Sequence, residues 1–224
     1  MDASARALDT EGFCIVADVC TEPQCEALLS ALPKASGAGS RRLLELPEIR
    51  AVVGHIRLHS RIGPLLPAGA LAVQCSLFAK GSESNWAVAP HQDLSIPVAE
   101  MVSATECSGW SVKEGALFTQ PPASVLGSLV AVRLQLDPGS ASNGPLRVIR
   151  GSHALGRLSS EAVASLCATN QQVPCVVPRG GALLLKPLAV HASAKAHSSG
   201  ARRVLHFLFG PPQLPLGLRW AVAI

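Results

Sequence analysis

The spacing of apolar residues predicts helices in the first third of the chain. Residues 47–61 place their apolar side chains on one face of a helix. An earlier helix is predicted from Thr21 to the residue before Pro33, because Thr21 and Gln24 have the spacing of a capping box and proline ends a helix. Residues 12–16, which precede this helix, form a short apolar run that predicts a strand.

From about residue 70 onward the pattern changes to short runs that alternate apolar and polar residues, as on strands with one buried face. The longest run extends from Leu126 to Asp137 and places Arg133, Gln135 and Asp137 opposite its apolar residues. Further strands are predicted at residues 71–80, 146–149, 172–177, 181–186, 190–195 and 202–209, with a short helix from Ser159 to about Cys167. Helices followed by many short strands predict a mainly β protein, a sandwich or barrel of the jelly-roll type with flanking N-terminal helices.

Length and composition are those of one globular domain with a substantial core. The 224 residues are expected to form a single domain over residues 1–224, with a helical flank at about 1–69 and a jelly-roll core at about 70–210. Apolar residues make up 48% of the chain and charged residues 15%, which excludes a disordered protein. The net charge of +4 is spread without a basic run, so a small molecule is expected as the partner rather than nucleic acid. The sequence does not define an oligomeric state.

The cysteines and the N-terminus favour a cytoplasmic protein. The seven cysteines are an odd number without a C-x-x-C pair, which is typical of reduced, mostly buried thiols. The first residues, Met1 to Ser4, lack the basic and apolar regions of a signal peptide. No window reaches the apolar length of a membrane span, so no membrane association is expected.

The candidate chemistry lies in the tripeptide His91-Gln92-Asp93. On a strand, His91 and Asp93 point to the same face because they are two residues apart. Non-haem Fe(II) oxygenases bind their metal with two histidines and one carboxylate and leave the other metal positions open. His91 and Asp93 are therefore candidates for two ligands of such a site.

A third ligand and a co-substrate anchor are available near the C-terminus. His191 follows an apolar strand and is the candidate for the second histidine. Arg202 and Arg203 come shortly after it, and Ser198-Ser199-Gly200 has the composition of a turn, so we expect a hairpin that returns one arginine toward His191. A guanidinium there suits a dicarboxylate co-substrate, because arginine binds carboxylates with a planar fork.

These residues occur in an order that resembles the phytanoyl-CoA dioxygenase family of Fe(II)/2-oxoglutarate-dependent dioxygenases. The resemblance extends from about Gly12 to Phe209, and its specificity comes from the order of the motifs rather than from His-x-Asp alone. The matching segments are residues 77–80, 85–86, 91–93, 110–115, 120–122, 143–148, 151–153, 191–193 and 202–206.

The resemblance implies a double-stranded β-helix that holds Fe(II) between two sheets. His91, Asp93 and His191 would be the metal ligands and the catalytic centre. Arg202 would bind the distal carboxylate of 2-oxoglutarate, with assistance from Ser193 and Lys80. The family's spacing favours Arg202 over Arg203, and only one of two adjacent strand residues can point inward.

The implied activity is the oxidation of a C–H bond in a small molecule with O2, with release of succinate and CO2. Because Asp93 supplies the carboxylate ligand, hydroxylation is favoured over halogenation. Two alternatives remain: a non-catalytic metal-binding jelly-roll module, and a cupin-like metalloenzyme that does not use 2-oxoglutarate. The Arg202 position argues against the second alternative, since that chemistry needs no dicarboxylate anchor.

Several other polar residues are given structural roles. His153, in the Gly-Ser-His segment, is expected to close a turn by hydrogen bonds, and His206 is interpreted as a surface or strand residue without a role. Trp86, Lys113 and Arg133 are favoured as packing residues over residues of a substrate mouth.

Overall fold

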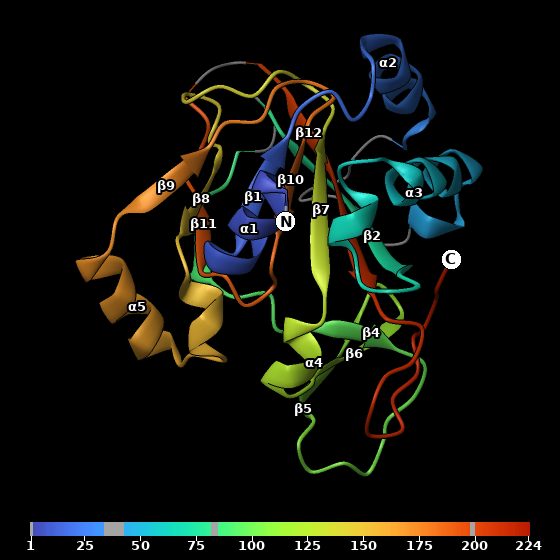
Figure 1. The fold of residues 1–224 in the computed structure, drawn as a ribbon, viewed down its shortest axis with the longest axis vertical. Helices are drawn as coiled ribbons and strands as arrows, with labels where there is room; N and C mark the ends of the chain where they lie inside the picture. The colour runs from blue at the N-terminus through green and yellow to red at the C-terminus, as the bar shows by residue number, and fades with distance from the viewer. Residues whose placement is uncertain (1, 34–42, 82–84, 198–199) are drawn as a thin grey trace.

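The computed structural model describes residues 2–33, 43–81, 85–197 and 200–224. Two antiparallel sheets lie against each other, and helices cover the outer face of the larger one (Figure 1). This arrangement is the predicted double-stranded β-helix, or jelly roll, with N-terminal helices at its flank.

The larger sheet has five strands in the order β1–β10–β7–β12–β2. Its strands are β1 (Phe13–Val16), β10 (Ala182–Leu185), β7 (Val130–Gln135), β12 (Arg202–Gly210) and β2 (Leu71–Lys80). The central strand β12 pairs with β2 on one side and with β7 on the other. Because side chains alternate along β12, Leu205, Phe207 and Phe209 face the helices, whereas Arg202, His206 and Leu208 face the interior cavity.

The smaller sheet has four strands in the order β3–β11–β8–β9, and a three-stranded sheet β4–β6–β5 lies at one end of the molecule (Figure 1). The four strands are β3 (Val88–His91), β11 (His191–Ser193), β8 (Leu146–Ile149) and β9 (Gln172–Cys175). The three are β4 (Ile96–Val98), β5 (Ser108–Lys113) and β6 (Ala116–Gln120).

The N-terminal helices cover the outer face of the five-stranded sheet. They are α1 (Ala3–Thr10), α2 (Glu22–Ala31) and α3 (Pro47–Leu58). Helix α2 begins with the predicted capping box of Thr21 and Gln24. The buried stripe of α3 packs with β2, β7, β10 and β12 in one apolar core, which fixes the sheet against the helical flank. Within the described residues, the structure contains no helix of the length and apolarity required for a membrane span.

One expectation about local structure was wrong, and one helix was not predicted. The strand predicted from Leu126 begins only at Val130, because residues 123–127 form the short helix α4 (Ala123–Gly127). Helix α1 was not predicted; its Asp2 makes no side-chain cap and only its Leu8 is buried, so the sequence signal is weak. The remaining helix, α5 (Ser160–Thr169), begins after the capping residue Ser159.

The predicted hairpin between the His191 and Arg202 strands was also wrong. β11 is flanked by β3 and β8, and β12 is flanked by β2 and β7, so the two strands belong to different sheets. Each strand already has a partner on both edges, and therefore neither has an edge left for the other. Ser198 and Ser199 of the predicted turn lie outside the described residues. Arg202 enters the interior from the sheet opposite to His191.

Candidate metal centre and cavity

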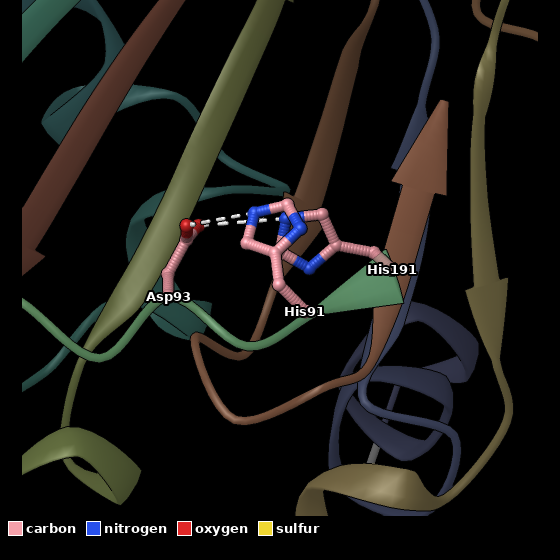
Figure 2. Close-up of side chains that lie close together, drawn as sticks. All are labelled: His91, Asp93 and His191. Carbon is pink, nitrogen blue, oxygen red and sulfur yellow. Dashed lines mark ion pairs between the residues drawn. The ribbon is translucent and has the colours of Figure 1, made fainter. Parts of the chain in front are cut away.

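The candidate metal ligands come together at the inner face of the smaller sheet. His91 ends β3, His191 begins β11, and the two residues are direct partners in the antiparallel pair. Their rings lie 4.3 Å apart between centroids. Asp93 follows β3 and turns toward both rings: its carboxylate oxygens lie 3.6 Å from Nε2 of His91 and 3.7 Å from Nε2 of His191 (Figure 2).

Backbone hydrogen bonds orient both imidazoles for metal binding. Nδ1 of His91 lies 2.8 Å from the carbonyl oxygen of Ala89, and Nδ1 of His191 lies 2.9 Å from that of Ala189. A carbonyl accepts only, so each Nδ1 carries a proton, and in the neutral ring Nε2 keeps the lone pair that a metal requires. One ligand atom from each of His91, Asp93 and His191 lies within 4.8 Å of the other two. This donor set fits a divalent first-row metal such as Fe(II).

Burial and charge set the protonation of these ligands. Burial lowers the pKa of His191 to about 4, with Asp93 opposing the shift, so this imidazole is neutral at pH 7. Burial alone would raise the pKa of Asp93, but its interactions with the imidazoles of His191 and His91 outweigh burial and hold that pKa well below its usual range. At pH 7 Asp93 is therefore ionised and His191 is neutral, and these are the forms that bind a metal cation.

Gln92, between two of the candidate ligands, fixes the segment that carries them. Its buried side chain donates to the carbonyl oxygens of Gly156 and Leu188 and accepts from the backbone N–H of Leu158, at 2.8, 2.7 and 2.8 Å. Asp93 donates its own backbone N–H to Pro187 at 2.9 Å. These bonds hold the segment after β3 against the chain that leads into β11.

The Gly-Ser-His segment supports His191 from the other side. The Ser152 hydroxyl donates to the carbonyl oxygen of Ile149 and accepts from the N–H of Val190, at 2.7 and 2.8 Å. His153 contacts the carbonyl oxygen of Asp9 in α1 at 2.9 Å. Both residues therefore make structural contacts, but the side chain of His153 contacts α1 rather than closing a turn as predicted.

A cavity of about 360 Å³ opens beside the three candidate ligands. It lies between the sheets, because its lining residues come from strands of all three sheets. Its cationic residues are Lys80, Lys113, Arg133 and Arg202, and its apolar residues include Phe78, Trp86, Leu94, Ile96, Phe118, Leu129 and Leu208. Asp93 is the one carboxylate among the described residues that line it.

Lys80 and Arg202 are paired across β2 and β12 at one end of the cavity. The Lys80 ammonium donates to Oγ of Ser193 at 3.0 Å and to the carbonyl oxygen of Ala194 at 2.8 Å. Arg202 is 6% exposed, and its Nε has no hydrogen-bond partner in the described part of the chain. Burial, with the charge of Arg133, lowers the pKa of Arg202 to about 10, so it remains cationic at pH 7. A buried guanidinium with unused donors fits an anionic ligand.

Arg203 lies on the opposite face of β12 and is already paired. Its side chain forms two hydrogen bonds with the carboxylate of Asp137, at 2.8 and 2.7 Å, and its backbone N–H donates to the same carboxylate. The alternation along the strand therefore directs Arg202 into the cavity and Arg203 away from it.

The sequence interpretation missed two polar residues of the cavity wall, Arg133 and His206. Both line the cavity, and they are direct partners in the pairing of β7 with β12. His206 is 7% exposed, so it is not a surface residue. Period-two alternation could have found it, because it lies four residues after Arg202 and thus on the same face of the strand. Trp86 and Lys113 also line the cavity, whereas they were favoured as packing residues.

Comparisons with known proteins assign the sequence to a family and find solved structures with a similar fold. A family model described as "Phytanoyl-CoA dioxygenase (PhyH)" matches residues 8–204. No curated protein matches the sequence.

Solved structures resemble the fold at low sequence identity. HygX from Streptomyces hygroscopicus, with nickel and 2-oxoglutarate bound, has a TM-score of 0.64 and 17% identity over 96% of this chain and 89% of its own. EctD from S. alaskensis, in its apoform, has a TM-score of 0.69 and 15% identity over 100% of this chain and 84% of its own. The epimerase SnoN, in complex with Fe3+, alpha ketoglutarate and nogalamycin RO, has a TM-score of 0.67 and 16% identity over 99% and 94%.

Proposed function

Because the chain belongs to the phytanoyl-CoA dioxygenase family, we propose that it is an Fe(II)- and 2-oxoglutarate-dependent dioxygenase that hydroxylates a C–H bond of a small molecule. The observation that carries this proposal is the presence of two complementary sites in one cavity. One is the group of His91, Asp93 and His191, whose ligand atoms lie within 4.8 Å of one another. The other is the buried, unpartnered Nε of Arg202.

Each residue has a role that follows from its chemistry. His91 and His191 would hold the metal through Nε2 and Asp93 through a carboxylate oxygen. Arg202 would bind the distal carboxylate of 2-oxoglutarate, and Lys80 and Ser193 would add donors beside it. When bound, the iron with 2-oxoglutarate and O2 supplies the oxidising chemistry, with succinate and CO2 as by-products. The apolar residues of the cavity would exclude water from the substrate.

Hydroxylation is one of several reactions that an enzyme with this fold could catalyse. The structural neighbours include the carbocyclase SnoK, the epimerase SnoN and EctD with bound 2-oxoglutarate and 5-hydroxyectoine, so this fold accommodates several outcomes. Hydroxylation rather than halogenation is supported by Asp93, because its carboxylate would occupy the metal position that a halide would otherwise take.

The direct test is whether the protein converts 2-oxoglutarate to succinate in the presence of Fe(II) and O2. A slow conversion without any added substrate is expected, and it should disappear in His191→Ala. Metal binding without succinate would instead support a non-catalytic module. Turnover of another substrate without 2-oxoglutarate would support a cupin-like metalloenzyme.

The proposed enzyme is a single domain with a small-molecule substrate. One apolar core joins the helical flank at 1–69 to the β core at 70–210, which supports a single unit. All seven cysteines are free, and all except Cys167 are buried. Reduced thiols support the proposed cytoplasmic location.

A further inference from the structure

Arg133 is a cavity arginine that the proposed metal and co-substrate sites do not use. It projects from β7 into the cavity, where its guanidinium lies 5.3 Å from the ring centroid of Phe78. One of its nitrogens lies 2.8 Å from Nδ1 of His206. Within the described residues it forms no ion pair and no other hydrogen bond, although arginine has five N–H donors.

The contact with His206 fixes the direction of that hydrogen bond. Arginine only donates, so Nδ1 of His206 accepts and the proton of the neutral imidazole lies on Nε2. Burial, with the charge of Arg133, lowers the pKa of His206 to about 3, which agrees with a neutral ring. His206 thus orients Arg133 without neutralising its charge.

The charge of the cavity wall exceeds what the proposed cofactors balance. Lys80, Arg133 and Arg202 are cationic, and Asp93 is the one carboxylate among the described lining residues. Bound Fe(II) would add two positive charges and 2-oxoglutarate two negative charges, so these cancel and the surplus on the wall remains. Asp93 is the carboxylate whose charge acts on Arg133, and it would also be a metal ligand. A partly buried cation with so little counter-charge is costly, and a ligand anion would relieve that cost.

The strand register places the backbone of Arg133 away from the co-substrate end, although its charge acts on both Lys80 and Arg202. Arg202 is opposite Lys80, whereas His206, four residues further along β12, is opposite Arg133. Four residues of extended strand correspond to roughly 13 Å along the sheet. Lys80 and Ser193 lie at the Arg202 end of the cavity. The backbone of Arg133 therefore lies further along the sheet than the backbone of Arg202, although both side chains line the same cavity.

Beyond Arg133 the cavity wall includes several apolar residues, together with Gln74 and Ser76 on the same sheet face and Lys113 over the Phe118 ring. Leu208 follows His206 on the inward face of β12, and Leu129, Phe118 and Ile96 line the same cavity. The cavity of about 360 Å³ is near the lower end of the range for small-molecule sites. Space beside Arg133 is therefore suited to a small molecule with one anionic group and an apolar body.

We propose that Arg133, oriented by His206, binds the anionic group of the substrate, and that the substrate is a small amphipathic carboxylate or phosphate monoester whose apolar part lies toward Leu208 and Phe118. This inference rests on the proposed function, because it assigns Arg202 to 2-oxoglutarate. It makes Arg133 a residue that determines substrate specificity.

The test measures ligand binding rather than turnover. The protein is loaded with Ni(II) and 2-oxoglutarate and titrated calorimetrically, at one pH and ionic strength, with hexanoate, hexyl phosphate and the uncharged hexanamide. We expect at least one anion to bind about tenfold more tightly than hexanamide, as for a charged hydrogen bond. The preferred anion distinguishes a carboxylate from a phosphate substrate.

Arg133→Met should abolish this preference while leaving the affinities for hexanamide and 2-oxoglutarate unchanged. Arg133→Gln makes the same test if the methionine variant does not fold. Arg147→Met is the matched control, because Arg147 is exposed on the neighbouring sheet, and it should behave as wild type.

Two results would overturn the inference. One is a wild-type protein that binds hexanamide as tightly as both anions. The other is a variant at Arg133 that loses 2-oxoglutarate affinity as strongly as anion affinity, since Arg133 would then belong to the co-substrate site. A wild-type protein that binds neither Ni(II) nor 2-oxoglutarate would contradict the proposed function instead. The titrations of metal-free protein would then decide the role of Arg133.

Discussion

The side chains of Lys80 and Ser193 are joined across the two facing sheets by a hydrogen bond of 3.0 Å. Ser193 belongs to β11, two residues after His191, and Lys80 is the β2 partner of Arg202. The bond therefore links the strand that carries a candidate metal ligand to the pair of strands that carries the candidate co-substrate anchor. The two parts of the proposed site depend on the packing of one sheet on the other.

The protonation of Lys80 should control 2-oxoglutarate binding. Burial, followed by the charges of Arg202 and Arg133, lowers the pKa of Lys80 to about 8. Its positive charge is lost as pH rises through that value, so the affinity of the Ni(II)-loaded protein for 2-oxoglutarate should fall in this range. The decrease should be roughly tenfold or more, as for the loss of a charged hydrogen bond. Calorimetry across this pH range measures it, and Lys80→Met should bind weakly without this pH dependence. A wild-type affinity that stays constant through this range would remove Lys80 from the co-substrate site.

The neighbouring arginines Arg202 and Arg203 should have separate effects. Arg203→Ala removes a partly exposed pair with Asp137 and should lower the free energy of unfolding by about 1 kcal/mol. It should leave 2-oxoglutarate affinity unchanged. Arg202→Ala should weaken 2-oxoglutarate binding by an amount corresponding to about 2–5 kcal/mol. Urea unfolding and calorimetry of both variants measure these effects. The reverse pattern would make Arg203 the anchor.

Gln92 should be required for an ordered metal site although its side chain bonds backbone groups rather than supplying a metal ligand. Gln92→Leu would leave two carbonyl oxygens and one N–H without their partner, at a cost of about 3 kcal/mol of unfolding free energy. Metal affinity should fall by about 10–100-fold, as for other residues that position ligands. Competition with a metal-binding dye measures the affinity. Gln120→Leu, which changes a glutamine bonded to Arg157 outside the site, should leave it unchanged. Wild-type metal affinity in Gln92→Leu would refute this role.

The metal-free protein should lose stability in mild acid. Burial lowers the pKa of His191 to about 4 and of His206 to about 3. The unfolded chain takes up these protons below about pH 6.5, whereas the folded chain does so only at lower pH. Unfolding therefore becomes easier as pH falls, by about 1.4 kcal/mol per pH unit for each group that titrates. Urea titrations between about pH 7 and 4 give the free energy of unfolding at each pH. This free energy should fall less steeply with decreasing pH in His206→Leu than in the wild type, and as steeply as in the wild type in His197→Leu, which changes an exposed histidine. Equal slopes in all three proteins would show that His206 is not held neutral.

The sequence predicted the inner architecture well where alternation and local spacing carry the information. The helix at 47–61 and the strands at 71–80 and 202–209 appear close to their predicted positions, because each has one continuous apolar face. The His-x-Asp segment predicted a shared direction for His91 and Asp93, and the structure brings both to His191.

The choice of sheet for each strand was not predictable from the same pattern. Alternation defines the two faces of a strand but not its neighbours, so the strands of His191 and Arg202 were wrongly paired as a hairpin. In the last part of the chain, β10, β11 and β12 alternate between the larger and the smaller sheet, so the strands of His191 and Arg202 face each other across the cavity. The partnership of Arg133 with His206 depends on the register of β7 against β12, which is a tertiary property.

The most direct test of the proposed site is the visible absorption of the anaerobic protein after addition of Fe(II) and 2-oxoglutarate. We expect a metal-to-ligand charge-transfer band in the wild-type protein. The band should be absent in His91→Ala, which lacks a metal ligand, and should require a much higher 2-oxoglutarate concentration in Arg202→Ala. A protein that binds iron without developing the band would contradict the 2-oxoglutarate site and favour a metal-binding module or a cupin-like enzyme.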